Sequence, residues 1–269
     1  MGGIDHATIG IILLTAVLIL PVLVFIRRAR QGVPLYVRRI PGVDAIEEAT
    51  GRAAELGRPI SFSTGLLGIS PALYAVLGVL FHVARRAARY NNRLIVPQND
   101  PQVVAVVEDT LRDAYRTEGK VSQFDPKSVV FLSEEQFAFA AGYMGMVQRE
   151  QVATAFLFGA FAAESLMLAE AGQQIGAMQV AASLSPEQVP YFICTCDYTL
   201  IGEELYGASA YLTREPIQLG SLFGQDRAKL VFFIFIVAGS LIATYNSLAA
   251  VYQWSDIPNV VSFLTWKWW

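Results

Sequence analysis

The sequence predicts an α/β fold: a Rossmann-like, doubly wound, mostly parallel sheet of five strands, flanked by helices and bracketed by two transmembrane helices. Residues 7–26 and 230–252 are uncharged and apolar, and each run has the roughly 20 residues that a membrane-spanning helix needs. Between them, short apolar runs alternate with helical patterns, which indicates parallel strands joined by right-handed crossovers. The strand runs are apolar throughout, as is typical of parallel strands buried on both faces.

The first predicted elements follow from local signals. Residues 41–57 have small and apolar residues at helical spacing, early acids and a final glycine, which predicts a helix. A short strand is expected at 60–63 and a glycine-containing loop at 64–69. Ser70 then caps a helix that has proline at its first position and arginines in its last turns near residue 90.

The same strand–helix unit then repeats along the chain. Asn99 and Asp100, before a proline, cap a helix that ends on a glycine, and Ser133 with Gln136 forms a capping box for another. A last helix is expected to begin near Thr199. The four remaining strands are predicted at residues 94–96, 129–132, 153–158 and 177–182.

Two internal segments have an alternative interpretation. Residues 60–83 are uncharged and residues 153–169 carry only Glu164, so either could be a membrane span. Proline caps and glycine turns divide both into a strand, a turn and a helix, which favours the sheet. Interrupted spans exist in transporters, so both interpretations stay open.

The domain organisation follows from these elements. We expect an external N-terminus at 1–6, transmembrane helices at 7–26 and 230–252, a cytoplasmic domain at 27–229 and an external, Trp-rich tail at 253–269. The 269 residues, 54% of them hydrophobic, suit one domain with anchors. A net charge of −3 argues against a nucleic-acid partner, because such proteins carry basic patches.

Positive charge near the two apolar runs predicts the topology. The leader before the first run has no Lys or Arg, so the run is not a secretory signal. Basic residues instead lie on the inner side of each run, which places both termini outside by the positive-inside rule. These topology-determining residues are Arg27, Arg28, Arg30, Arg227 and Lys229. Indole rings prefer the bilayer interface, and the expected anchors there are Trp254, Trp266, Trp268 and Trp269.

A ligand site is expected, if anywhere, beyond the carboxyl ends of the strands. The loop after the first strand could offer backbone N–H groups to an anion. It lacks the spacing of a dinucleotide or P-loop motif, so an ordinary turn and helix caps are the favoured interpretation. The candidate ligand-binding residues are Thr64, Gly65, Gly68, Ser70, Asn99 and Asp100.

The sequence predicts no catalytic residue, no metal site and no cofactor. His82 lies on an apolar helix and is expected in the core rather than as a general base. Cys194 and Cys196 are expected as reduced thiols, the alternative being a redox pair. Glu164 is the most unusual acid, because a buried carboxyl group must be paired or protonated. We expect it in an ion pair or a subunit contact, with a functional role as the alternative.

Small residues are dense in the later helices. Close helix contacts use such residues, either inside one domain or between subunits. The examples are Ala138, Ala140, Ala141, Gly142, Gly145, Ala160, Ala162, Ala163, Gly207, Ala208 and Ala210. The expected partners are therefore the lipid bilayer and further copies of this chain, in a large and symmetric homo-oligomer.

Four segments together resemble a known family. They are RRIPGVDAIEEATGRAAELGRP, VPQNDP, FLSEEQFAFAAG and CDYTLIGEELYGASAYLTREP. The chain resembles an uncharacterised family of bacterial membrane proteins catalogued only as a domain of unknown function. The resemblance implies a bacterial membrane protein and carries over no catalytic residue. We expect the protein in the inner (cytoplasmic) membrane.

Three classes of function remain open from the sequence. The first is a structural, homo-oligomerising scaffold on the cytoplasmic face of the membrane. The alternative is a small-molecule or nucleotide-sensing regulatory domain that uses the strand ends. A membrane enzyme or a pore-forming assembly is a further alternative.

Overall fold

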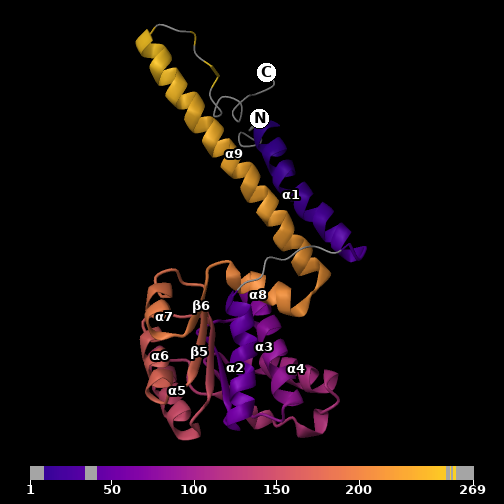
Figure 1. The fold of residues 1–269 in the computed structure, drawn as a ribbon, viewed down its shortest axis with the longest axis vertical. Coiled ribbons are helices and arrows are strands. Elements are labelled where there is room, and N and C mark those ends of the chain that lie inside the picture. The colour runs from indigo at the N-terminus through magenta and orange to yellow at the C-terminus, as the bar shows by residue number, and fades with distance from the viewer. Residues whose placement is uncertain (1–8, 34–40, 253–254, 256, 259–269) are drawn as a thin grey trace, which may run out of the picture. The chain divides into compact units, whose positions relative to one another are not determined.

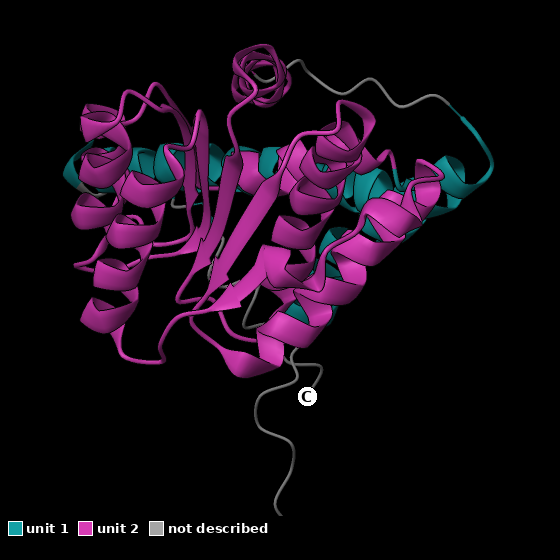
Figure 2. Ribbon diagram, turned by 90° about the horizontal axis from the view of Figure 1, so that it is seen from below, with its two compact units in different colours: residues 1–37, 215–269 teal, residues 38–214 magenta. Residues whose placement is uncertain are grey.

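The computed structural model describes residues 9–33, 41–252, 255 and 257–258. The chain forms two compact units (Figure 2). Residues 38–214 make up the α/β unit, and residues 1–37 with 215–269 make up the other.

The α/β unit contains a parallel sheet in the order β3-β2-β1-β4-β5-β6, so the order reverses between β1 and β4. The doubly wound fold class is confirmed, with one strand more than expected. The strands are β1 (Ile60–Gly65), β2 (Leu94–Gln98), β3 (Val129–Phe131), β4 (Thr154–Ala160), β5 (Met178–Ser183) and β6 (Tyr198–Ile201).

Helices cover both faces of this sheet (Figures 1 and 2). One layer contains α2 (Pro41–Leu56), α3 (Pro71–Arg89), α4 (Pro101–Thr117) and α8 (Glu204–Thr213). The other contains α5 (Gln136–Glu150), α6 (Ser165–Gln174) and α7 (Val189–Thr195). Two short 3-10 turns, Val121–Gln123 and Pro126–Ser128, lead into β3.

Each layer of helices closes its own hydrophobic core. Phe62, Phe156 and Phe158 point from the sheet into the core beneath α2, α3, α4 and α8. Ile95 and Leu157 point into the core beneath α5, α6 and α7. Neighbouring residues of one strand thus face opposite cores, which is why β1, β2 and β5 are buried along their whole length. Their polar residues, such as Ser61 and Gln179, are buried together with the apolar ones.

The two segments with an alternative interpretation are parts of this sheet unit. Residues 60–83 form β1 and most of α3, and residues 153–169 contain β4 and the start of α6. Among the described residues, the helices long and apolar enough to cross a membrane are residues 10–30 and 216–249.

Two local expectations were wrong. Residues 198–201, expected to begin a helix, pair with β5 as the edge strand β6. Gly202, at φ +57°, then turns the chain into α8. The capping box is also not formed, because Glu135 is the N-cap of α5 and Ser133 Oγ accepts from the Glu135 amide. The Gln136 side chain donates to Glu164.

The second unit contains α1 (Ile9–Arg30) and α9 (Pro216–Tyr252). Both include the predicted apolar runs where described. The 37 residues of α9 give a helix about 55 Å long. It begins well before residue 230, so Arg227 and Lys229 lie inside this helix rather than ahead of it.

The two helices are antiparallel and pack closely. A Cβ atom on Gly220 would overlap the backbone of Ile26, and one on Gly224 would overlap the backbone of Val22. The rings of Phe25 and Phe223 lie 6.0 Å apart between these contacts. Glycines four residues apart let two helix backbones approach in membrane proteins, and α9 uses them against α1.

Candidate functional site

The six candidate ligand-binding residues lie at the carboxyl ends of two neighbouring strands. Thr64 and Gly65 end β1, and Asn99 and Asp100 directly follow β2. Gly68 and Ser70 lie in the loop between β1 and α3. A Cβ atom on Gly68 would lie 3.3 Å from Asp100 Oδ2, so the two loops are adjacent.

Polar side chains of these loops bond to the local backbone. Ser70 Oγ accepts a hydrogen bond from the Leu73 amide at 3.4 Å. Asp100 Oδ1 accepts one from the Gln102 amide at 2.7 Å. Both are N-caps, which satisfy amides that a helix leaves free. Asn99 Nδ2 donates to the carbonyl of Ser133 at 2.6 Å, which ties β2 to the loop after β3. Ligand binding by these residues stays a prediction.

The point where the strand order reverses is tightly packed. Such a point is where open α/β sheets usually bind ligands. Here the Leu66 amide donates to the Ala160 carbonyl at 2.8 Å. A Cβ atom on Gly65 would overlap that carbonyl and the ring of Phe161, and one on Gly159 would overlap the Thr64 carbonyl. The ends of β1 and β4 therefore meet backbone to backbone.

One pair of polar side chains at this edge leaves a hydrogen-bond donor without an acceptor. Thr64 Oγ1 donates to Gln98 Oε1 at 2.7 Å, and both residues are fully buried. Gln98 Nε2 has no hydrogen-bond partner among the described residues. A buried amide left without an acceptor costs about 1–3 kcal/mol of stability. Gln98 is therefore a polar side chain at this edge whose burial is not fully compensated by hydrogen bonds.

Glu164 is fully buried just beyond β4. Its carboxylate accepts a hydrogen bond from Gln136 Nε2 at 2.6 Å and from the Ala162 amide at 3.0 and 3.2 Å. No basic side chain of the described residues contacts it, so the expected intrachain ion pair is not formed. Amide donors from α5 and from the β4–α6 loop satisfy the acid instead.

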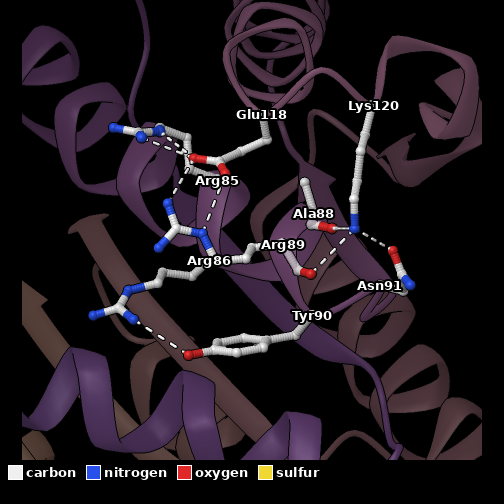
Figure 3. A network of polar contacts seen from close by, with 8 residues as sticks. All are labelled: Arg85, Arg86, Ala88, Arg89, Tyr90, Asn91, Glu118 and Lys120. Atoms are coloured by element: carbon white, nitrogen blue, oxygen red, sulfur yellow. Dashed lines mark hydrogen bonds and ion pairs between the residues drawn. The ribbon is translucent and has the colours of Figure 1, made fainter.

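A cluster of basic residues at the end of α3 ties that helix to α4 (Figure 3). The Glu118 carboxylate bonds Arg85 at 2.8 Å and Arg89 at 3.2 Å. These bonds, from Arg89 first, hold the pKa of Glu118 below its usual value. Lys120 Nζ donates to the carbonyl of Ala88 at 2.9 Å, and so caps the helix with a positive charge.

His82 precedes this cluster on α3. Burial, followed by the charge of nearby Arg86, lowers the pKa of His82 to about 4. Its Nε2 lies 3.8 Å from the Glu47 carboxylate and has no hydrogen-bond partner among the described residues. The imidazole is therefore neutral at pH 7 and lies mostly buried, as the sequence predicts.

The small residues of two helices have different surroundings. Those of α8 are buried, and Gly78 of α3 packs against Ser209. On α5, Ala140 is buried in the core, whereas Ala141, Gly142 and Gly145 line a groove of about 450 Å³ beside β2 and β3. The ion pair of Arg93 with Glu150, at 2.7 Å, also lines this groove. Its lining includes Ile95, Val130, Leu132, Ala141, Gly142 and Gly145.

The residues predicted to set the topology and to anchor the chain at the membrane interface lie in different parts of the chain. Arg27, Arg28 and Arg30 form the basic last turn of α1. Arg227 and Lys229 lie within α9. The predicted interface tryptophans lie outside the described residues: Trp254, Trp266, Trp268 and Trp269. The part of the chain that the structure describes contains no group of three or more His, Cys, Asp or Glu residues that could hold a metal ion.

Sequence reasoning missed two features. The Gly220–Gly224 contact had a visible signal, the four-residue spacing in GSLFG. The pairing of Gln136 with Glu164 had none, because the two residues are far apart in sequence and meet only when α5 and the β4–α6 loop are placed.

Comparison with known proteins identifies the family but no named relative. No curated protein and no solved structure matches the chain. A family described as "Domain of unknown function (DUF6754)" matches residues 3–254, nearly the whole chain. The chain, with its six-stranded parallel sheet and two long apolar helices, therefore belongs to this domain family of unknown function.

Proposed function

We propose that this protein is a membrane-anchored scaffold that assembles from several copies of the chain. The α1–α9 hairpin would hold the α/β unit at the cytoplasmic face of a bacterial inner membrane, with both termini outside. The observation that carries the proposal is the backbone contact of α1 with Gly220 and Gly224 of α9. Two helices packed this closely form a defined surface, on which further copies can order themselves.

The outer surface of the hairpin supports this proposal. Large apolar side chains are exposed along both helices and need lipid or protein to cover them. They include Ile11, Ile12, Leu13, Ile19, Leu20, Leu23, Phe233, Ile234, Ile236 and Leu241. The tight packing where β1 meets β4 argues in the same direction, because it leaves the usual ligand position of this fold filled with backbone.

The mass of the complex in lipid nanodiscs, measured by native mass spectrometry, tests this proposal. We expect a discrete multiple of the 29.5 kDa chain with no additional small-molecule mass. Introducing isoleucine at Gly224 should disperse the complex, because its side chain would collide with α1. Isoleucine at Gly51, where a Cβ meets open space on α2, is the control. A monomer at all protein concentrations would refute the scaffold.

A second candidate function is a ligand-sensing domain at the strand ends, and Gln98 is the observation that favours it. Its free Nε2 lies next to Thr64 in the predicted site, where a ligand oxygen would satisfy it. In the same spectra, a retained nucleotide-sized mass that disappears in Gln98→Leu would support sensing. Gln148→Leu on the exposed side of α5 is the control. A ligand-free spectrum at every nucleotide concentration tried would count against it.

A further inference from the structure

We infer that the charged segment Gln225–Lys229 of α9 is a pairing site within the membrane, where Arg227 of one copy meets Asp226 of the next. The inference rests on the proposed anchoring and self-association, and it names the residues through which copies would meet. It follows from the register of the hairpin, from the exposure of these side chains and from their charges.

The register of the hairpin fixes which residues share a level. Gly220 meets Ile26 and Gly224 meets Val22, so four residues forward on α9 correspond to four residues back on α1. Both helices rise about 1.5 Å per residue, and the same pairing continues along them.

This register places the charged segment beside the apolar middle of α1. Continuing from Gly224, Asp226 lies level with Leu20, and Arg227 lies level with Ile19. These positions are within about one helical turn of the middle of the run 7–26. Large apolar side chains of α1 are exposed on both sides of this level, from Ile11 to Val24. A bilayer that covers them therefore also surrounds the charged segment of α9.

The charged side chains point away from the hairpin. Asp226 is 66% exposed and Lys229 48% exposed, and Arg227 is exposed as well. Charged side chains at membrane depth are costly, and they face protein or a water-filled cavity rather than lipid. In the alternative membrane position, the bilayer covers only the part of α9 beyond the charged segment. Ile19, Leu20 and their neighbours on α1 would then be exposed to water. A protein surface over this part of the hairpin removes both costs.

The charges of the segment identify a second copy as the partner. Asp226 lies 3.8 Å from Lys229 in its own chain, whereas Arg227 contacts no acidic side chain among the residues that the structure describes. In a closed ring of identical chains, equivalent residues lie at the same depth. Arg227 therefore finds a carboxylate, Asp226 of its neighbour, within one residue of its own level. The segment is complementary to itself and needs no other protein.

Charge reversal in full-length protein tests this pairing. Arg227→Asp and Asp226→Arg are each expected to lower the fraction of assembled chains in lipid nanodiscs at least tenfold, because like charges then face each other. The double variant Asp226→Arg/Arg227→Asp should restore assembly, and Arg227→Lys should keep it. The control is Arg52→Asp, a charge reversal at an exposed position of α2. Native mass spectrometry gives the fractions.

The possible results separate the pairing from the scaffold itself. Single reversals that leave the assembled fraction at the wild-type level would overturn the pairing and leave the scaffold standing. A double variant that stays dispersed while Arg227→Lys assembles would also overturn it. A monomeric wild type would overturn the scaffold and the pairing together.

Chemical labelling distinguishes pairing from a water-filled pore. Gln225→Cys, at an exposed position of the same segment, is introduced after Cys194 and Cys196 are replaced by serine, and a membrane-impermeant maleimide is added to intact assemblies. We expect protection from labelling, with labelling restored on unfolding in detergent. Rapid labelling in the intact assembly would place this segment in an aqueous path and overturn the pairing.

Discussion

At the scale of single residues, Gly65 allows the close approach of β1 to β4. It adopts φ +64°, and a Cβ there would overlap the Ala160 carbonyl. We expect Gly65→Ala to lower the free energy of unfolding by about 3 kcal/mol, the sum of the left-handed backbone cost and overpacking. Thermal unfolding of the detergent-solubilised chain measures this.

Gly57 separates the two contributions to that loss. It has a similar φ of +61° and nothing within 4 Å of the Cβ position. Gly57→Ala should therefore cost only the backbone part, about 1–2 kcal/mol. Equal losses at both positions would show that the packing of β1 against β4 contributes little.

His82 should make stability depend on pH. Its pKa is about 4 in the folded protein and about 6.5 when unfolded, so the unfolded chain takes up the proton first as the pH falls. The contribution of neutral His82 to the free energy of unfolding is complete above pH 6.5 and is lost between pH 6.5 and about 4. This contribution amounts to at most about 3 kcal/mol. His82→Leu should flatten the stability profile across this window. Unfolding by urea at several pH values measures the slope; an unchanged slope would contradict the prediction.

At the scale of elements, two Gly→Ala substitutions in helices should have opposite effects, one at the α1–α9 contact and one on α2. At Gly220 the new Cβ would overlap the backbone of Ile26, so Gly220→Ala should destabilise the hairpin by about 1–3 kcal/mol. At Gly51, in a helix with open space around the position, alanine should stabilise by about 0.5–1 kcal/mol. Thermal unfolding gives both signs.

A local measurement shows whether the loss at Gly220 arises in the hairpin. Cysteines introduced at Phe25 and Phe223, whose rings lie 6.0 Å apart, should cross-link in a chain that lacks Cys194 and Cys196. Gly220→Ala should slow this cross-link, and Gly51→Ala should leave it unchanged. Equal cross-linking rates in the parent chain and in both alanine variants would show that Gly220 does not determine the packing of the hairpin.

The elements also show what the sequence can predict. β1, β2, β4 and β5 were predictable because short runs with apolar residues alternate with helical patterns, and the caps at Ser70 and Asp100 follow from local chemistry. β6 was missed because an edge strand of four residues, with Tyr198 and Ile201 exposed, has no apolar run. Residues near the candidate site were predictable as caps, whereas the bond from Thr64 to Gln98 depends on how two strands are placed side by side.

At the scale of the whole molecule, the positive charges of the two helices should differ in their effect on topology. Arg27, Arg28 and Arg30 end α1, where the positive-inside rule acts. In the inferred register, Arg227 and Lys229 lie at membrane depth and pair with neighbouring charges. We therefore expect the three arginines of α1 to determine the orientation, and the two basic residues of α9 to determine assembly.

Reporter fusions test this division. In the native chain, alkaline phosphatase fused to either terminus should be active and a fluorescent protein fused there should be dark, because the proposed topology places both termini outside. Replacing the three arginines of α1 by glutamine should give mixed orientations, since positive charge near the span ends sets topology. Replacing Arg227 and Lys229 by glutamine should leave the orientation unchanged and reduce assembly. Inversion by the α9 variant would instead place its charges at the membrane surface, and the inferred register would then be wrong.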